Sequence, residues 1–201
     1  MYLFGDSYFE LTVLKNVFQA VFIFYLFSEI CLLCFTGMYG RKKSGNGERA
    51  DRGSCLLIVA GFMLIMGINL ILRKHTPYVM PVFLFWAGIV FTLAGIIVRV
   101  YSVWTLRRFF TFSVRVRSGQ KIIQSGPYRL IRHPAYSGSI LSLTGIAMCF
   151  RSVLGLMGTL VVIAIVYGYR ISVEEKALER NFKTDYTEYK KRTRKIIPFL
   201  L

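Results

Sequence analysis

Two polar segments border the apolar runs of this chain. The first, "GPYRLIRHPAYSG" at residues 126–138, places two arginines, a histidine and two tyrosines directly before an apolar run. The second, Arg170 with Glu174 and Glu175, lies at the end of the last apolar run. A helix N-terminus can bind a carboxylate or phosphate, a glutamate can bind an ammonium or ribose hydroxyl, and an arginine can bind a carboxylate. These residue types could therefore hold the charged groups of a ligand.

The spacing of the residues indicates how helices would position them. Pro134 suits the first turn of a helix because it lacks the N–H that would be unsatisfied there, which puts His133 near the N-cap. Arg170 and Glu174 are four residues apart and share a helix face, whereas Glu175 is rotated by about 100°.

A purely structural interpretation of both segments is also open. Arg129 and Arg132 could contact lipid phosphates, His133 could cap a helix, and the tyrosines could belong to an interfacial aromatic belt. Arg170 and Glu174 could form a surface pair that stabilises the protein by only a few tenths of a kcal/mol.

The elements that must position these residues are membrane helices. The chain has 201 residues, of which 55% are hydrophobic, and this is typical of a small polytopic membrane protein. Its five apolar runs cover about residues 11–39, 54–72, 80–106, 135–150 and 152–171. The fourth run reaches only about 24 Å and should pair with the fifth as a tight hairpin turning at residues 150–152.

The predicted fold is all-α, with about five transmembrane helices, a structured cytoplasmic loop and a C-terminal amphipathic helix. The loop covers 107–134, and the amphipathic helix follows Arg170, where Leu178, Phe182, Tyr186 and Tyr189 recur at helical spacing. We divide the chain into an N-terminal membrane region, 1–106, and a catalytic region, 107–201, and expect a monomer.

The basic residues predict the topology. Five lysines and arginines lie in residues 41–53, seven in 107–135 and nine in 170–201. By the positive-inside rule these segments are cytoplasmic, which places the N-terminus outside and both polar segments inside. The net charge of +16 therefore reflects topology, and we expect no nucleic-acid partner.

Few other residues in the apolar runs invite a chemical interpretation. Glu29 and Arg99 each cost on the order of 3 kcal/mol inside a membrane, and their similar depth predicts an ion pair. Cys31 and Cys34, one helical turn apart with no second pair, make a poor metal site, so we expect no metal. Gly138 and Ser142 offer a small face for helix packing.

The two polar segments together, "SGPYRLIRHPAYSG" and "EEKALERNFKTDYTEYKKRTRKIIP", resemble the isoprenylcysteine carboxyl methyltransferase family and its phospholipid methyltransferase relatives. The resemblance covers about residues 113–201, and the short N-terminal region resembles prokaryotic members. One departure is Lys183, where the family usually has glycine.

The resemblance implies an integral membrane enzyme that transfers a methyl group from S-adenosylmethionine, leaving S-adenosylhomocysteine. Its acceptor would be the C-terminal carboxylate of an isoprenylated cysteine or a similar lipophilic molecule or prenylated peptide, reached through the membrane lipid. Arg170 would bind the acceptor, and Arg170 and Glu174 would be catalytic. The implied cofactor contacts are Gln120, Lys121, Ile122, Ile123, Tyr128, His133, Pro134, Ala135, Tyr136, Glu174 and Glu175.

A carboxylate acceptor needs no base, so positioning and charge compensation can supply most of the catalysis. An amine acceptor, as in a phospholipid N-methyltransferase, would need a proton removed, with His133, Glu174 or Glu175 as candidates. Two alternatives remain at this point. One is a sterol-type membrane reductase using NADPH, although such reductases typically have Asn where this chain has Ala135. The other is a membrane scaffold that binds anionic lipid headgroups.

Overall fold

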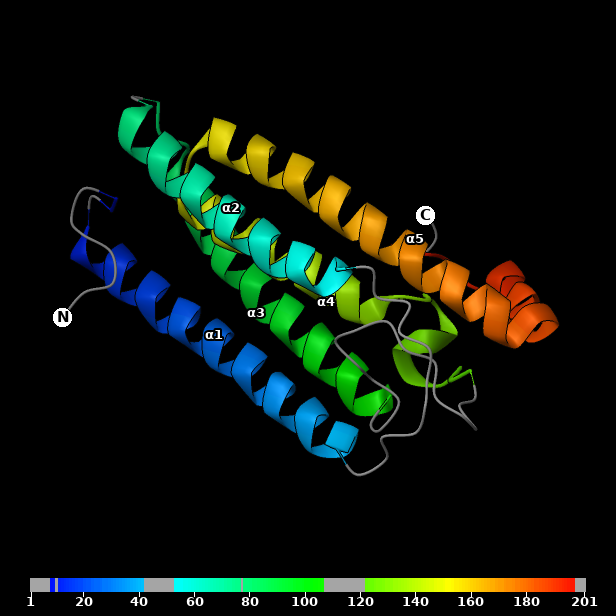
Figure 1. The fold of residues 1–201 in the computed structure, drawn as a ribbon. Helices are drawn as coiled ribbons and strands as arrows, with labels where there is room; N and C mark the ends of the chain where they lie inside the picture. Colours follow the sequence, from blue (N-terminus) through cyan, green and yellow to red (C-terminus); the bar gives the residue numbers. More distant parts are fainter. Residues whose placement is uncertain (1–7, 10, 42–52, 77, 107–121, 198–201) are drawn as a thin grey trace.

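The part of the chain that the computed structural model describes, residues 8–9, 11–41, 53–76, 78–106 and 122–197, is built from helices. They are α1 (Thr12–Arg41), α2 (Ser54–His75), α3 (Val82–Leu106), the short 3-10 helix η2 (Gly126–Arg129), α4 (Pro134–Cys149) and α5 (Val153–Arg192). The long helices lie side by side in an elongated bundle (Figure 1). In the described residues the predicted all-α fold is confirmed, with one helix for each of the five predicted apolar runs.

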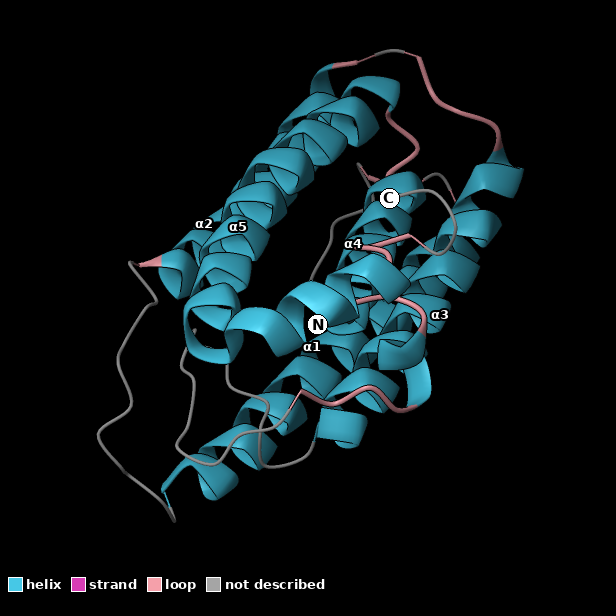
Figure 2. Cartoon of the chain, turned by 90° about the vertical axis from the view of Figure 1, so that its right-hand side faces the viewer, coloured by secondary structure: helices cyan, strands magenta, loops and turns pink. Residues whose placement is uncertain are grey.

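The helices pack in a fixed set of pairs. α3 packs closely on α4, α2 on α5, and α1 on α3. In the turned view of Figure 2, α2 and α5 form one side of the bundle and α3 with α4 the other. α4 is only 16 residues long and joins α5 through the predicted tight turn, where the Ser152 side chain caps α5 by accepting a hydrogen bond from the Gly155 N–H at 3.1 Å.

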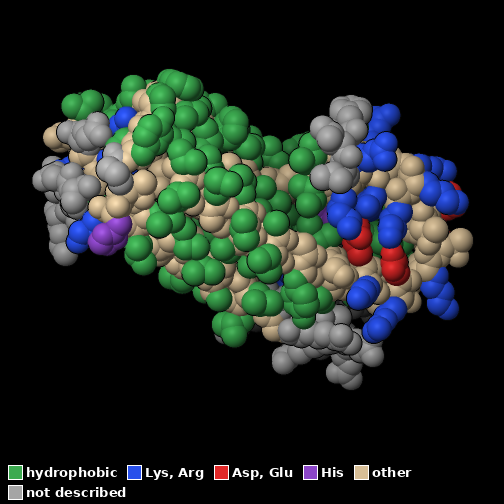
Figure 3. Space-filling model, turned by 90° about the horizontal axis from the view of Figure 1, so that it is seen from above, with side chains coloured by type: hydrophobic (Ala, Val, Ile, Leu, Met, Phe, Trp, Pro, Cys, Tyr) green, Lys and Arg blue, Asp and Glu red, His purple; other side chains and the backbone are tan. Residues whose placement is uncertain are grey.

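The outer surface of the bundle is apolar. α1, α2, α3 and α5 are each long and apolar enough to cross a membrane. Large apolar side chains point outward along them, including Phe27, Ile97 and Ile165, each more than half exposed. Figure 3 shows apolar side chains over the body of the molecule, while most of the charged side chains in this view gather at one end. The chain is therefore an integral membrane protein.

Glycines allow the closest helix contact in the bundle, between α3 and α4. A Cβ added at Gly145 would lie 2.5 Å from the Gly88 carbonyl oxygen and 2.6 Å from the Thr92 backbone nitrogen. Gly138 is similarly close to the backbone of Arg99. The small face predicted at Gly138 and Ser142 is thus a helix-packing surface.

Gly145→Ala is expected to push α3 and α4 apart and to lower the free energy of unfolding by roughly 1–3 kcal/mol, the usual cost of overpacking. The matched control is Gly168→Ala, because nothing lies within 4 Å of a Cβ there. We expect the thermal midpoint in detergent to fall for Gly145→Ala and to hold for Gly168→Ala. Equal midpoints for the two variants would refute this packing.

The C-terminal amphipathic helix is a continuation of α5 across a kink. Helical backbone runs from Val153 to Arg192 and is interrupted at Lys183, whose φ of 42° and ψ of −113° lie outside the helical region. The kink turns the last part of the helix, so that Tyr186 and Tyr189 are buried. A positive φ is costly for a residue with a Cβ but not for glycine. This gives a physical reason for the glycine that the family resembled by this sequence usually has where this chain has Lys183.

Lys183→Gly is therefore expected to raise the thermal midpoint. The strain at such a residue costs on the order of 1–3 kcal/mol, and the added chain entropy of glycine offsets about 0.5–1 kcal/mol of the gain. Lys183→Ala is the control, because it removes the charge and keeps the Cβ. A midpoint for Lys183→Gly no higher than that of Lys183→Ala would contradict the strained backbone.

Candidate functional site

The first turn of α4 begins as the sequence predicts. His133 occupies the N-cap position and Pro134 the first helical position, although the His133 side chain makes no capping hydrogen bond. Both residues are buried. The imidazole of His133 is instead directed into the protein, with its Nε2 3.3 Å from a carboxylate oxygen of Glu175. His133 is thus the N-cap residue of α4, as predicted, and its backbone carbonyl rather than its side chain accepts the first hydrogen bonds of the helix.

The segment before α4 is held in place by the C-terminal end of the chain. Ile131 and Arg194 form an isolated parallel β-bridge. The Arg132 N–H donates to the Arg194 carbonyl at 2.7 Å. The Ser137 hydroxyl donates to the carbonyl of Ile196 at 2.6 Å. Two stretches that are about sixty residues apart in sequence thus form one structural unit.

Arg132 anchors this unit. Its Nε donates to Glu175 Oε1 at 3.0 Å, and its Nη1 donates to the carbonyl oxygens of Thr193 at 2.5 Å and Lys190 at 3.3 Å. The Arg132 side chain is only 9% exposed. The alternative that Arg132 contacts lipid phosphates is therefore wrong, whereas Arg129 is exposed.

Glu175, just beyond the apolar part of α5, stabilises the same structural unit in its ionised form. Burial raises its pKa, but hydrogen bonds from His133 and Arg132 and the charge of Lys195 lower it more, to about 2. Since a free glutamate titrates near about 4.3, the folded pKa is the lower one. The stabilisation is therefore present above the unfolded pKa and is lost as the pH falls from about 4 towards 2.

Glu175→Gln is expected to lower the thermal midpoint at pH 7 and to flatten its decline between about pH 4 and pH 2. The measurement is the midpoint of wild type and variant across that range. If both proteins lose stability in parallel on acidification, Glu175 does not carry the pH dependence.

The hydroxyl of Tyr136 is the centre of the site. It donates a short hydrogen bond to Glu174 Oε2 and accepts one from Arg170 Nε at 2.9 Å. The His133 ring stacks on the Tyr136 ring with centroids 5.7 Å apart. Arg170 and Glu174 thus share one helix face, as their spacing predicts, and both reach the same tyrosine of α4. Arg170 is 2% exposed, so the alternative of a surface pair is wrong.

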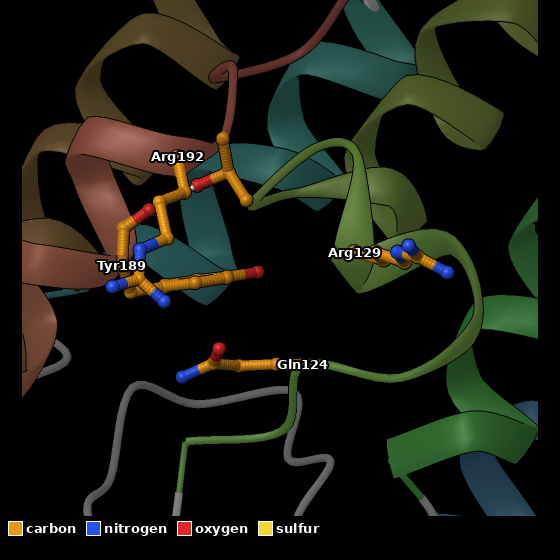
Figure 4. Close-up of a pocket in the computed structure, with 5 residues that line it drawn as sticks. Gln124, Arg129, Tyr189 and Arg192 are labelled. Atoms are coloured by element: carbon orange, nitrogen blue, oxygen red, sulfur yellow. Dashed lines mark hydrogen bonds between the residues drawn. The ribbon is translucent and has the colours of Figure 1, made fainter.

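A cavity of about 350 Å³ lies between the η2 segment and the end of α5 and is lined by Gln124, Arg129, Tyr189, Arg192 and Thr193. Figure 4 shows Gln124 and Tyr189 facing each other across it, with Arg192 beside Tyr189. The Tyr189 hydroxyl donates to the Tyr128 carbonyl at 2.6 Å, which joins the wall of the cavity to η2. An open polar cavity with an aromatic wall and two arginines can accept an anionic or planar group.

The structure brings most of the predicted site residues together. The residues His133, Pro134, Ala135 and Tyr136 from α4 meet Arg170, Glu174 and Glu175 from α5, and Tyr128 lies buried in η2. Ile122 and Ile123 are half-buried in the segment that leads to η2. Gln120 and Lys121 lie outside the described residues. No group of three or more metal-binding side chains occurs in the described part of the chain.

The sequence interpretation missed the residues that line the cavity. The helical spacing predicts only that Tyr189 belongs to an amphipathic helix, and contact with lipid phosphates is one open interpretation of Arg129. Gln124 carried no signal other than its closeness to the four contacts predicted at 120–123.

Comparisons with known proteins point to one family. The family model for phospholipid methyltransferase matches residues 83–185, which include Arg170, Glu174 and the first turn of α4. The chain is 26% identical over 183 residues to a probable protein-S-isoprenylcysteine O-methyltransferase of Oryza sativa subsp. indica, covering 88% of this chain and 96% of the relative. It is 29% identical over 115 residues to protein-S-isoprenylcysteine O-methyltransferase B of Arabidopsis thaliana, covering 56% of this chain and 58% of the relative.

A solved structure has a similar fold. It is a eukaryotic intramembrane Ras methyltransferase, isoprenylcysteine carboxyl methyltransferase, which aligns with a TM-score of 0.56 at 20% identity. The alignment covers 72% of this chain and 52% of the solved chain, so this chain corresponds to about half of that protein.

Proposed function

Since this chain belongs to the phospholipid methyltransferase family, we propose that it transfers a methyl group from S-adenosylmethionine to a lipophilic acceptor, the C-terminal carboxylate of an isoprenylated cysteine or a close analogue. The observation that carries the proposal is the Tyr136 hydroxyl, which joins Glu174 and Arg170 in one hydrogen-bonded group. A carboxylate for a cationic cofactor and a guanidinium for an anionic acceptor are thereby held next to each other. The reductase alternative is set aside, because the family and the relatives above are methyltransferases.

The donor set fits S-adenosylmethionine, which carries a cationic sulfonium and ammonium, a carboxylate and a planar adenine. When bound, the cofactor would supply an electrophilic methyl group on a sulfonium sulfur, which leaves as a neutral thioether. Glu174 suits its cationic part, because Glu175 is already paired with Arg132 and Lys195. The cavity beside Tyr189 suits the adenine and carboxylate. The remaining contacts we propose are Gln120, Lys121, Ile122, Ile123, Tyr128, His133, Pro134, Ala135, Tyr136 and Glu175.

Arg170 is the residue we assign to the acceptor. Its guanidinium is buried inside the bundle and lies at the end of the apolar part of α5. A carboxylate on a long apolar chain can reach this depth from the lipid, whereas a small soluble acid would have to leave water to do so. Arg170 would orient the acceptor carboxylate, and no base is needed because that carboxylate is already ionised.

The basic segments support a cytoplasmic site with the N-terminus outside. In this arrangement the water-soluble cofactor enters from the cytoplasm and the acceptor from the membrane. Residues 107–201 then supply the catalytic groups, and residues 1–106 supply the membrane support.

One observation favours a second candidate, a phospholipid amine as acceptor, because the matching family model is that of phospholipid methyltransferases. The two candidates differ in the bond that is formed. A methyl ester is cleaved by mild alkali and releases methanol, whereas a methylated amine is stable to it.

The test is to incubate the detergent-purified protein with methyl-labelled S-adenosylmethionine and either a farnesylcysteine analogue or phosphatidylethanolamine. We expect alkali-labile label on the farnesylcysteine analogue. Alkali-stable label on phosphatidylethanolamine alone would replace the first candidate by the second. Label on neither acceptor, from protein that binds S-adenosylhomocysteine, would overturn both acceptors.

A further inference from the structure

The predicted ion pair between α1 and α3 is present. Arg99 Nη2 donates to Glu29 Oε2 at 2.8 Å, and Arg99 Nε lies 2.5 Å from Glu29 Oε1, which makes the contact two-pronged. The side chains of Arg99 and Glu29 are 9% and 21% exposed. A buried ion pair is weak evidence for stability, because well-packed apolar residues often do as well. A pair buried this deeply is therefore expected to have a role other than stabilising the fold.

The rest of the Arg99 guanidinium reaches the first turn of α4. Its Nη1 donates to the Ala135 carbonyl at 3.2 Å and to the Ser139 hydroxyl. Ser139 Oγ also donates to the Ala135 carbonyl, at 3.1 Å. Ala135 directly precedes Tyr136, so Arg99 is bonded to the backbone of the turn that carries the central tyrosine of the site.

The backbones of the two helices are also in direct contact at this point. A Cβ added at Gly138 would lie 2.6 Å from the Arg99 backbone nitrogen. The turn can therefore neither approach α3 nor slide along it without disturbing Arg99. Since a hydrogen bond weakens steeply when its length or angle changes, a small shift of this turn would break the contact between Tyr136 and Glu174.

We propose that Arg99, oriented by Glu29, is a positioning residue that fixes the depth and rotation of the first turn of α4, and through it the part of the site that binds the cofactor. The proposal rests on the proposed function, because it takes S-adenosylmethionine to be the cofactor that binds at this site. It also gives a role to α1, the helix that carries Glu29. This helix lies outside the residues matched by the family model. Glu29 and Arg99 touch neither the acceptor nor the cofactor in this account.

Three variants probe the arrangement. Arg99→Lys keeps the charge but cannot bind Glu29 through two nitrogens while also reaching α4. Glu29→Gln removes the charge that orients Arg99. Ser139→Ala removes one partner on α4 and leaves the ion pair intact, which keeps the test available if the other variants fold poorly.

The matched control is Thr159→Val. Thr159 accepts a hydrogen bond from Asn69 Nδ2 at 2.8 Å, and both side chains are fully buried between α2 and α5. Eleven residues, or about 16 Å of helix, separate Thr159 from Arg170. This variant loses a buried interhelical bond far from the site and reports the effect of lowered stability alone.

Each variant is measured by its thermal midpoint, by calorimetric affinity for S-adenosylhomocysteine and by hydrogen exchange of the peptide 134–149 without ligand. We expect Arg99→Lys and Glu29→Gln to raise the dissociation constant at least about tenfold and Ser139→Ala about threefold, with faster exchange at the start of α4. Thr159→Val should lower the midpoint and leave affinity and exchange at 134–139 unchanged.

The proposal is overturned if all three variants lower the midpoint as Thr159→Val does while affinity stays within twofold of wild type and exchange in 134–149 is unchanged. A wild type that does not bind S-adenosylhomocysteine would instead sink the proposed cofactor. Faster exchange at 134–139 in the Arg99 and Ser139 variants would in that case still support the positioning role.

Discussion

His133→Ala and Glu174→Ala are each expected to weaken the binding of S-adenosylhomocysteine by about a hundredfold or more while the protein stays folded. In the proposed site Glu174 supplies the carboxylate that binds the cationic end of the ligand, and hydrogen bonds to charged groups contribute roughly 1.5–3 kcal/mol each. The His133 ring stacks on Tyr136 and contacts Glu175, so its removal loosens the whole wall of the site.

The affinity is measured by calorimetry on detergent-purified variants whose folding is checked by their thermal midpoints. Glu179→Ala is the control, because Glu179 is another glutamate of α5, paired with Lys190 on the exposed surface at 2.7 Å. We expect it to bind as the wild type does. Wild-type affinity in both His133→Ala and Glu174→Ala would refute the assigned site.

Arg170→Ala is expected to lower kcat for methyl transfer by about a hundredfold to a thousandfold, the usual effect of removing one group that stabilises or orients the reacting centre. Its effect on the affinity for S-adenosylhomocysteine should stay within about threefold. The physical reason is that Arg170 reaches the proposed cofactor side of the site through the Tyr136 hydroxyl, whereas its guanidinium is the group we propose to bind the acceptor.

Arg170→Lys separates the charge of this residue from its geometry. A lysine can attract the acceptor carboxylate but cannot bind it through two parallel N–H groups, so we expect an intermediate kcat. Steady-state kinetics with a farnesylcysteine analogue and the calorimetric affinity provide the two readouts. If Arg170→Ala loses affinity and turnover by equal factors, Arg170 belongs to the cofactor pocket.

The helices could be predicted from the sequence because the apolar runs contain few charged residues and are separated by short polar or basic segments. The bounds of α1 to α4 agree with the runs to within three residues. The kink at Lys183 could not be predicted, because lysine has no preference for a positive φ and only tertiary packing holds it there. Because the kink could not be predicted, the pairing of Ile131 with Arg194 could not be predicted either.

The site was predictable only in part. Helical spacing placed Arg170 and Glu174 on one face, and the proline rule placed His133 at the start of α4. Spacing alone could not decide between Glu174 and Glu175, because the decision depends on Arg132 and Lys195, which reach Glu175 from two other segments. The wall formed by Tyr189 depends in turn on the kink that turns the end of α5.

The most direct test of the central claim is calorimetric binding of S-adenosylhomocysteine to the detergent-purified wild-type protein, with NADPH as the comparison ligand. We expect saturable binding with a dissociation constant on the order of micromolar and a thermal midpoint that rises with ligand concentration. NADPH should produce neither effect. If the folded protein shows neither heat of binding nor a rise in its thermal midpoint with S-adenosylhomocysteine, the account is contradicted.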